Sequence, residues 1–342
     1  QLLKCDAYFQ VRNHILGRWQ SNVNAFLTEQ QAMKEINEKY KPLVPCVYEF
    51  LRRFGFLNAG IIRPYEDSCR NMNPKNYRVI VIGAGMAGLA SARQLDQFGF
   101  DVTILEARNR VGGRVHSDYS FGDKAVDLGA SIITGLEGNP LTNVCHQLKL
   151  SLCTLSGECP IFDIDGTTFE KKLDQYVEDT FNNLLEEANN RKNEFGDSLG
   201  EAFNSLLEQQ ELDDKQRRLI NWHVANLEYG CAAELSKVSL KYWDQDDSYE
   251  WAGDHCLIPN GYTYIAQALA KGLNIVFNSP VERIEYDPTS SFARPARVHT
   301  REGKGYEADA VLVTVPLGIL KTGMIQFSPS LPAEKQNAIK NL

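Results

Sequence analysis

"YRVIVIGAGMAG", residues 77–88, decides the fold of this 342-residue chain. An apolar, β-branched run leads into Gly83, Gly85 and Gly88, which have the G-x-G-x-x-G spacing. The first glycine permits a tight turn, the second lets the backbone approach a pyrophosphate, and the third lets the following helix pack closely. A second apolar strand ends at Glu106, at the distance where a carboxylate accepts ribose hydroxyls. The flanking strand and helix argue against a merely structural turn, so the order predicts a dinucleotide-binding domain with a parallel, doubly wound sheet.

A second glycine motif, "ILEARNRVGGR" at 104–114, favours FAD over a diffusible nicotinamide coenzyme. An extra glycine pair permits a second close approach of the backbone, and Arg114 can set a planar, charged fork against phosphate oxygens. A cofactor held from both sides of its pyrophosphate is buried and retained, as suits a flavin. Arg110 is expected to be a solvated loop charge. The other residues predicted here to bind FAD are Arg108, Gly112 and Gly113, with Leu128, Gly129 and Ala130 of "DLGA" continuing the wall.

Charge is shared unevenly along the chain. The formal net charge is -8, which excludes indiscriminate nucleic-acid binding by the whole molecule. Residues 1–63 hold nine Lys/Arg against five Asp/Glu, a net charge of +4, so the remainder is strongly acidic. The eight cysteines form no C-x-x-C pair, which is typical of reduced thiols, and no apolar run approaches a membrane span. Because the sequence begins at Gln1 and stops within a helical pattern, we expect a longer parent protein.

The patterns predict a small all-α bundle, then a Rossmann-like α/β domain interrupted by a mostly helical insertion. In the bundle, a Thr28–Gln31 capping box opens "EQQAMKEINEKY". A second helix, ending at Gly55, is predicted to place Val47, Phe50, Leu51 and Phe54 on one apolar face. Ser198 with Glu201 and Asp213 with Gln216 mark helix starts in the insertion. The predicted boundaries are 1–63 for the bundle, 64–77 for a linker, 78–155 and 250–338 for the α/β domain, 156–249 for the insertion, and 339–342 for the start of a further half.

Carboxylates and aromatic rings alternate in "YWDQDDSYEWAGDH", residues 242–255. Clustered carboxylates repel one another unless a cation offsets them, and a cation can also sit over aromatic faces. A basic peptide or a polyamine fits this description, and a solvated acidic loop is the plainer alternative. No metal site is predicted, because the spacing matches no calcium loop.

Long stretches of the sequence resemble a known family. "VIVIGAGMAGLASARQL", "VTILEARNRVGGR" and "DLGA" look like the FAD-binding half of flavin amine oxidases. "YFQVRNHILGRWQSNVNAFLT" resembles the SWIRM domain of chromatin proteins. The two in this order resemble the lysine-specific histone demethylases of the amine-oxidase type over nearly all of the chain. No coiled-coil tower interrupts the insertion, as in the tower-less branch that includes plant-type members.

The resemblance implies roles for particular residues. Thr314 and Pro316 are expected near the flavin, and Val281 at the adenine. His223 is expected to be a packing residue. The substrate-contacting positions of the family map onto Asn226, Trp243, Asp244, Asp246, Asp247 and His255.

The resemblance also implies an activity. A hydride would pass from the carbon beside a mono- or dimethyl-lysine amine to flavin N5, and formaldehyde and hydrogen peroxide would follow. The implied setting is the nucleus, with the histone H3 tail as substrate and chromatin or corepressor proteins as partners. The bundle's basic side chains could add weak contact with nucleosomal DNA or a histone, or form a solvated face; they are Arg12, Arg18, Lys41, Arg52 and Arg53.

Other functions remain open. The family's catalytic lysine is expected beyond Leu342, so we expect residues 1–342 alone to be inactive. A polyamine oxidase on the same scaffold is one alternative. A non-catalytic, FAD-binding chromatin scaffold is another.

Overall fold

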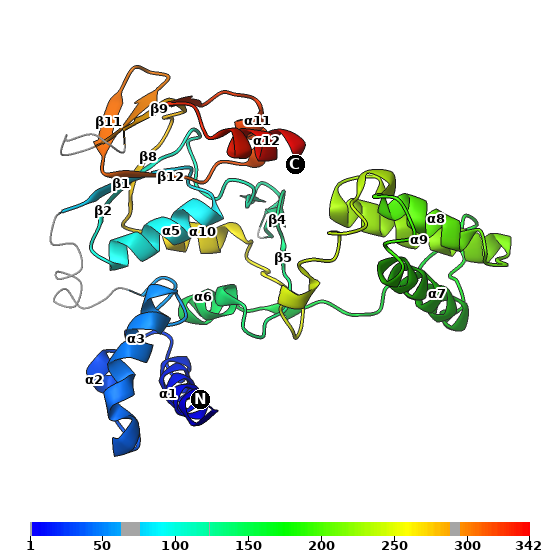
Figure 1. The fold of residues 1–342 in the computed structure, drawn as a ribbon, viewed down its shortest axis with the longest axis horizontal. Coiled ribbons are helices and arrows are strands. Elements are labelled where there is room, and N and C mark those ends of the chain that lie inside the picture. Colours follow the sequence, from blue (N-terminus) through cyan, green and yellow to red (C-terminus); the bar gives the residue numbers. More distant parts are fainter. Residues whose placement is uncertain (1, 63–75, 123, 288–294) are drawn as a thin grey trace. The chain divides into compact units, whose positions relative to one another are not determined.

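The computed structural model describes residues 2–62, 76–122, 124–287 and 295–342. The predicted linker, 64–77, lies outside these residues except for its last two. The chain forms two compact units, one made of 1–155 with 251–342 and the other of 156–250. Each is described separately below (Figure 1). No helix among the described residues is long and apolar enough to cross a membrane.

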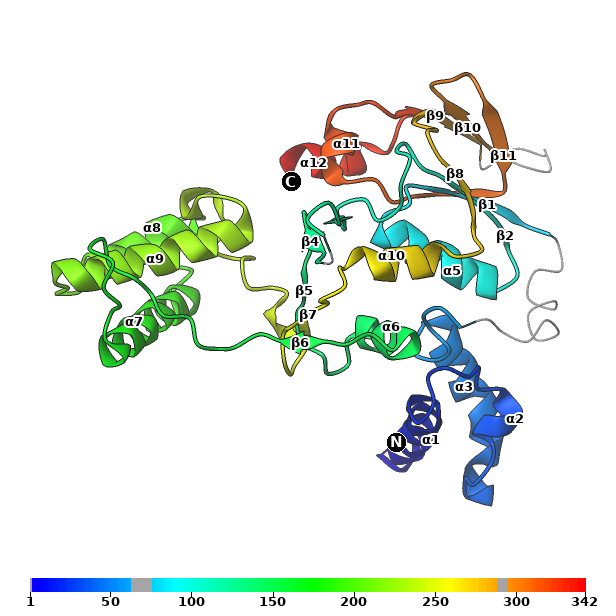
Figure 2. The same ribbon diagram turned by 180° about the vertical axis from the view of Figure 1, so that it is seen from behind.

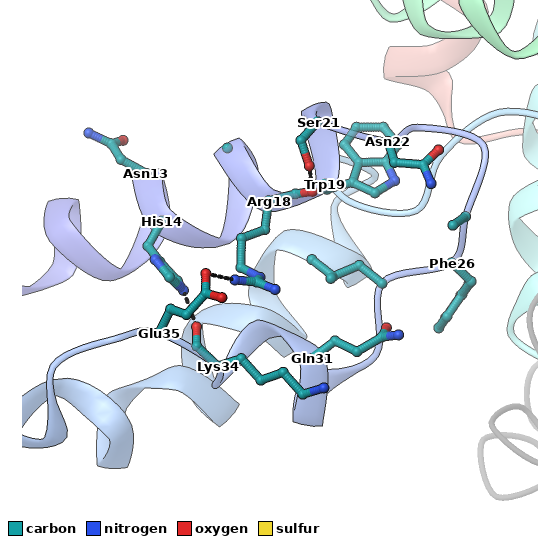
Figure 3. Close-up of a pocket in the computed structure, with 13 residues that line it drawn as sticks. Asn13, His14, Arg18, Trp19, Ser21, Asn22, Phe26, Gln31, Lys34 and Glu35 are labelled. Carbon is teal, nitrogen blue, oxygen red and sulfur yellow. Dashed lines mark hydrogen bonds and ion pairs between the residues drawn. The ribbon is translucent and has the colours of Figure 1, made fainter.

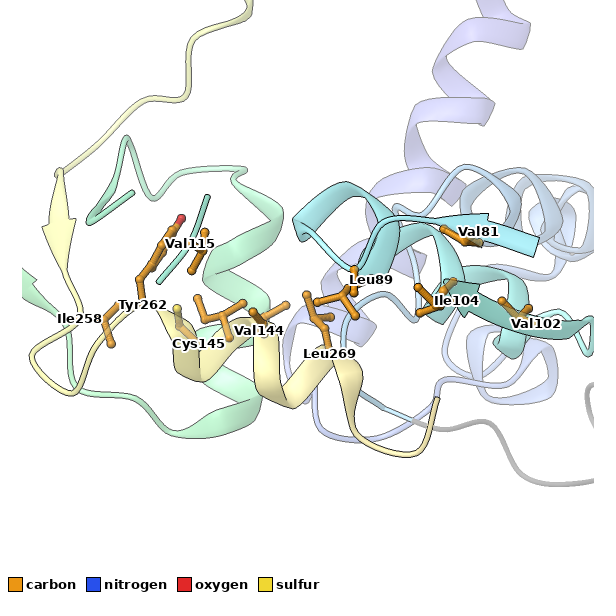
Figure 4. Packing of buried hydrophobic residues seen from close by; sticks show 14 of the residues in the cluster. Val81, Leu89, Val102, Ile104, Val115, Val144, Cys145, Ile258, Tyr262 and Leu269 are labelled. Atoms are coloured by element: carbon orange, nitrogen blue, oxygen red, sulfur yellow. The ribbon is translucent and has the colours of Figure 1, made fainter. Parts of the chain in front are cut away.

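A four-stranded parallel sheet organises the first unit. Valines 79 and 81 of its central strand face one side, where they pack with Leu89, Ile104 and Leu269. Two helices cover this face, and Figure 4 shows the apolar side chains that meet there. Because both faces of the central strand are covered, four of its five residues are buried. The sheet order is β12 (Ala310–Val313), β1 (Arg78–Ile82), β2 (Asp101–Leu105) and β8 (Asn274–Val276), and the helices are α5 (Met86–Gln97) and α10 (Thr263–Ala270).

A second sheet covers the other face. Ile80, Ile82 and Leu105 pack there against Ile284 and Val298. A doubly wound fold would have helices on this face as well. In the described residues a second sheet takes their place. The alternating "ARVHT" strand explains it, since its inward side is buried and needs an apolar partner. The sheet, seen from behind in Figure 2, has the order β11 (Gly305–Ala308), β10 (Ala296–Thr300), β9 (Val281–Tyr286) and β13 (Gln326–Ser328), and α11 (Leu317–Lys321) and α12 (Ala333–Asn341) belong to the same part of the chain.

Every secondary structure element among the described residues of the front bundle is a helix, and turns and loops connect these helices. Its core contains Val11, Ile15 and Trp19 on one helix and Val47 and Leu51 on another. The elements are α1 (Leu2–Gln20), α2 (Glu29–Ala32), the 3-10 helix η1 (Glu38–Leu43) and α3 (Val44–Arg53).

Two sequence predictions for the bundle need correction. The Thr28 capping box is present, but the helix that it opens ends at Ala32 instead of running on to residue 40. Glu35 soon afterwards has a left-handed backbone (φ 63°), which no helix accommodates. Phe50 and Phe54 do not face the core: they are 43% and 62% exposed. Val44 and Tyr48 are buried in their place, so the buried stripe lies three residues nearer the N-terminus than the predicted one.

Two glutamines of the α/β domain bond to the bundle within the first unit: Gln97 Nε2 donates to Ile62 O (2.9 Å), and Gln147 makes three further bonds. Gln147 Nε2 donates to the carbonyls of Val23 (3.0 Å) and Ala59 (2.9 Å), and its Oε1 accepts from Ile61 N–H (2.8 Å). A Cβ on Gly60 would lie 2.2 Å from that oxygen. The Gln147 part of the joint therefore depends on a glycine and a buried amide. Gln147 lies on α6 (Pro140–Leu148), and the short strands nearby are β3 (Ser117–Asp118), β4 (Val126–Asp127), β5 (Ile132–Ile133), β6 (Cys153–Thr154) and β7 (Cys256–Leu257).

Three helices form the core of the second unit. Phe181, Phe203 and Leu219 meet in its interior. The predicted caps are present: Ser198 accepts from Glu201 N–H, and Asp213 forms a capping box with Gln216. The elements are α7 (Lys171–Asn190), α8 (Leu199–Leu207), α9 (Asp214–Cys231) and the 3-10 turns η2 (Leu235–Lys237) and η3 (Asp247–Tyr249).

Candidate functional site

The three glycines of the first loop have three different environments. Gly83 has a φ of +104°, where a side chain would be strained, and its N–H donates to Leu105 O (2.9 Å). A Cβ on Gly88 would lie 1.9 Å from Gly83 O, so only glycine lets α5 contact the turn. A Cβ on Gly85 would meet nothing within 4 Å. The backbone at Gly85 therefore faces open space at the N-terminus of α5.

The second glycine pair lies against the first loop. Gly112 N–H donates to Ala84 O (2.8 Å), and Gly85 and Gly112 form a parallel β-bridge. A Cβ on Gly113 would lie 3.2 Å from Gly85 Cα. Two motifs that are separated in sequence thus present bare backbone side by side. We call residues 83–88 and 112–114 together the glycine cradle.

The Glu106 carboxylate ties the two loops together. It is only 7% exposed. Its Oε2 accepts from Ala84 N–H (2.6 Å), and its Oε1 accepts from Arg108 N–H (2.8 Å). Each carboxylate oxygen has a further lone pair. The side chain is thus fixed by backbone and can still accept hydroxyl hydrogen bonds.

The three arginines of the second motif differ in what they contact. Arg108 and Arg110 both donate to Gly113 O, at 3.3 Å and 3.0 Å. Arg110 is half-buried, so the prediction of a solvated loop charge was wrong: its guanidinium holds the glycine turn. Arg114 is exposed, and no side-chain partner for it occurs in the described part of the chain. Its whole fork is available to an anion.

The "DLGA" segment runs beside Arg114. Ala130 N–H donates to Arg114 O (3.2 Å), and Leu128 N–H donates to His116 O (2.8 Å). A Cβ on Gly129 would lie 1.9 Å from Arg114 O, so this approach also requires glycine.

Residues from the C-terminal part of the sequence also contact the first glycine loop. Thr314 Oγ1 donates to Ile82 O (2.9 Å), at the entrance to the first loop. Pro316 follows two residues later as the N-cap of α11. Val281 begins β9 just after Ser279, whose N–H donates to Glu106 O (2.9 Å). The candidate cofactor residues of the first unit therefore connect to one another through short backbone contacts.

These residues fit FAD. The open backbone at Gly85, the unpartnered fork of Arg114 and the fixed carboxylate of Glu106 match the pyrophosphate and ribose of a dinucleotide. A side chain at the packed glycines would fill space that the cradle's own backbone occupies.

The candidate peptide-binding residues of the second unit centre on "WDQDD", residues 243–247, which we call the acidic segment. Asn189 holds its first two residues: Trp243 Nε1 donates to Asn189 Oδ1 (3.2 Å), and Asn189 Nδ2 donates to Asp244. Asp246 and Asp247 are exposed, and no cation pairs with either in the described residues. Asp244 is therefore partly committed to the fold, whereas the other two carboxylates are free.

The remaining predicted substrate residues are described by their own contacts. Asn226 is exposed on α9, and no hydrogen bond among the described residues joins it to the acidic segment. His255 belongs to the first unit, where its Nδ1 accepts from Gly135 N–H (2.9 Å) and the ring is left exposed. His223 stacks on Phe181 with centroids 5.2 Å apart, and burial lowers the pKa of its imidazole. These contacts agree with a packing role for His223.

Comparison with known proteins settles the family. The description "Flavin containing amine oxidoreductase" matches residues 86–342, and "SWIRM domain" matches residues 1–59. The chain belongs to the flavin-containing amine oxidoreductases. It is 39% identical to Protein FLOWERING LOCUS D of Arabidopsis thaliana over 98% of this chain and 43% of that protein. It is 40% identical to Lysine-specific histone demethylase 1 homolog 3 of Oryza sativa subsp. japonica, over 98% of this chain and 42% of the relative.

A human protein is also similar. Identity to Lysine-specific histone demethylase 2 of Homo sapiens is 36%, over 98% of this chain and 42% of that protein. The chain therefore spans less than half the length of each of these relatives. The predicted SWIRM and amine oxidase organisation is confirmed, and so is FAD as the cofactor of this flavin-containing family.

Sequence reasoning missed two contributors to the candidate sites of this amine oxidoreductase. Asn189 lies more than fifty residues before the acidic segment, and no motif marks it. The Ala84 N–H that holds Glu106 lies inside the recognised glycine motif, but a backbone group carries no sequence signal of its own.

Proposed function

We propose that this chain is the SWIRM and FAD-binding portion of an oxidase that removes methyl groups from mono- and dimethyl-lysine in a histone tail. The glycine cradle carries the proposal, because its bare backbone, Glu106 and the unpartnered Arg114 suit a retained dinucleotide. The names of the rice and human relatives supply the demethylase chemistry.

Residues of the first unit would hold FAD. Backbone at Gly85 and Gly113 would face the pyrophosphate, Arg114 would neutralise it, and Glu106 would accept ribose hydroxyls. Thr314 and Pro316 would border the flavin, and Val281 the adenine. When bound, FAD supplies an acceptor for the hydride that leaves the carbon beside the amine.

Residues of the acidic segment would select the substrate. The exposed carboxylates of Asp246 and Asp247 attract a Lys- and Arg-rich peptide, and Trp243 and Asp244 anchor the segment that carries them. Asn226 and the outward ring of His255 would add hydrogen bonds to the peptide. A trimethylated amine has no lone pair to form an imine, so only mono- and dimethyl-lysine would react.

The proposed setting is chromatin in the nucleus, with a histone H3 tail as substrate and chromatin or corepressor proteins as partners. The proposed catalytic lysine is one that the resemblance places beyond Leu342. The test therefore uses the full-length protein.

Peroxide release by the full-length protein tests this proposal. We expect a yellow protein that oxidises a dimethyl-lysine H3-tail peptide and leaves the trimethylated peptide untouched. Asp246→Asn should raise the KM for the peptide about 3-fold to 10-fold, since one charge contact of about 1 kcal/mol is lost. Glu186→Gln, which removes an exposed carboxylate of α7 in the same unit, should leave that KM unchanged.

Two outcomes would replace the proposed demethylase function with another function. A preference for spermine over the peptide would make the protein a polyamine oxidase, because a free polyamine also suits an acidic segment. A yellow protein with no turnover on any methylated peptide or polyamine would make it an FAD-binding scaffold.

A further inference from the structure

A pocket in the front bundle lies outside the candidate flavin and peptide sites. It has a volume of about 730 Å³ and lies between the end of α1 and the segment around α2. Cavities of this size hold small ligands or parts of a peptide. Figure 3 shows Arg18 and Glu35 pointing toward one another across it. We call it the α1–α2 pocket.

Two hydrogen-bond donors at this pocket have no acceptor. Trp19 lines it and is only 2% exposed, yet its indole Nε1 is buried without a hydrogen-bond partner in the described residues. Arg18 Nε is buried there and is likewise unpaired. Leaving a buried donor unsatisfied costs about 1–3 kcal/mol. Neither atom has accessible surface in this conformation, so an acceptor reaches them only when the side chains that cover them shift.

The guanidinium of Arg18 is only partly engaged. Its Nη1 donates to Glu35 Oε2 at 2.6 Å, while the Glu35 side chain is 80% exposed. Glu35 is held in this position by a left-handed backbone, φ 63°, which is costly for a residue other than glycine. Glu35 therefore behaves as an internal carboxylate that occupies Nη1 of the Arg18 guanidinium and leaves Nη2 without a partner in the described residues.

The other lining residues decide which kind of acceptor fits. Lys34 adds a second cation, and Phe26 and Leu27 add apolar wall. A nucleic-acid backbone needs a row of cations, whereas this pocket has two and sets a carboxylate against one of them. A carboxylate beside an apolar side chain matches the lining better. Acidic peptide segments carry that combination.

We propose that the α1–α2 pocket binds an acidic segment of a partner protein, with a Glu or Asp carboxylate held by Arg18 and Trp19 and a neighbouring apolar side chain against Phe26. The bound carboxylate accepts first from Nη2 of Arg18, and a shift of the side chains that cover Arg18 Nε and Trp19 Nε1 gives it access to these two donors. It competes with Glu35 for the fork of Arg18, so Glu35 limits the affinity.

Fluorescence anisotropy with the full-length, FAD-loaded protein tests the proposal. The probe is a fluorescein-labelled octapeptide of alternating glutamate and leucine, and its control replaces every glutamate by glutamine. We expect the glutamate peptide to bind at least about 10-fold more tightly, since a charged hydrogen bond contributes more than a neutral one. Equal binding of the two peptides, or no binding of either, overturns the proposal.

Variants that should change the affinity for the glutamate peptide in opposite directions locate the site. Arg18→Gln should weaken binding by about 10-fold or more. Arg12→Gln removes the same charge from α1 but outside the pocket lining, and it should change binding less than about 2-fold. Glu35→Gln should strengthen binding several-fold, because it removes the competitor and leaves an exposed position neutral. Equal losses in the two arginine variants, or weaker binding in Glu35→Gln, contradict the proposal.

A direct readout concerns Trp19 itself. With 5-fluorotryptophan incorporated, the ¹⁹F resonance assigned to Trp19 should shift when the glutamate peptide is added, and the other three tryptophans should not move. A short DNA duplex is the competitor. If the duplex displaces the peptide and Arg18→Gln weakens both equally, the pocket is a nucleic-acid site and the proposal fails.

Discussion

The glycine cradle and the acidic segment are both rich in sequence signal, but their geometry has different origins. In the cradle, backbone groups make the contacts: Gly112 N–H meets Ala84 O, and both oxygens of Glu106 accept backbone hydrogens. In the acidic segment, one distant side chain, Asn189, positions two residues while Asp246 and Asp247 stay exposed. Backbone sites are set by glycine spacing and tolerate few substitutions. Side-chain sites can be altered one group at a time.

The strongest test of this comparison is a pair of alanine substitutions in one loop. Gly88→Ala places a methyl group 1.9 Å from Gly83 O and should lower the free energy of unfolding of the first unit by about 3 kcal/mol or more, with loss of FAD. Gly85→Ala meets nothing within 4 Å and has an ordinary φ of -74°, so apoprotein stability should change by less than about 1 kcal/mol. Its FAD affinity should still fall at least about 10-fold, because the methyl group occupies the side that a phosphate approaches.

Thermal unfolding of the apoprotein and titration with FAD distinguish the two glycine effects. If Gly85→Ala binds FAD as the parent does, the open backbone is not the phosphate site. If Gly88→Ala is as stable as the parent, the packing argument for the third glycine is wrong.

Substitutions at Arg114 and Arg110 separate FAD binding from stability within the glycine motifs. Arg114→Ala removes an exposed, unpartnered fork, so we expect FAD to bind about 10-fold to 100-fold more weakly with no change in the melting temperature of the apoprotein. Arg110→Ala instead removes two bonds to backbone carbonyls and should lower that melting temperature. FAD titration and differential scanning fluorimetry measure both effects. A reversed result would assign the phosphate contact to Arg110.

The contrast between backbone sites and side-chain sites also explains which features could be predicted from the sequence. The glycine spacing and the apolar strands predicted the parallel sheet and its turn, because a strict backbone requirement leaves a strict residue pattern. Phe50 and Phe54 were placed on the wrong face, since helical spacing alone does not say which of two adjacent apolar stripes is buried. Gln147 could not be predicted as a domain joint, because its three partners are backbone groups of another domain. The Asn189 clamp had no signal either, because its partners are side chains more than fifty residues away in the sequence.

Asn189 gives the matching test for the acidic segment. Asn189→Ala removes the hydrogen bonds to Trp243 and Asp244, so the segment should loosen and the peptide KM should rise about 10-fold with FAD binding unchanged. Asn190→Ala changes the next residue of α7, which is exposed and makes no side-chain hydrogen bond in the described residues. Steady-state kinetics of the full-length variants should therefore separate the two asparagines. Equal kinetics for both would show that the clamp does not position the segment.

The smallest expected effect concerns pH and the core beneath the acidic segment. Burial lowers the pKa of His223 below its ordinary 6.5, so the folded unit binds fewer protons than the unfolded chain as the pH falls through that value. Stability is therefore full above the ordinary pKa and is lost progressively below it.

His223→Phe keeps the stacking on Phe181 and removes the titrating group, so its melting temperature should exceed that of the parent by a few degrees at about pH 5.5 and match it near pH 8. Trp222→Phe, one residue away and without a titratable group, should keep the parental pH slope. An unchanged slope in His223→Phe would mean that a group other than His223 causes the acid sensitivity of the second unit.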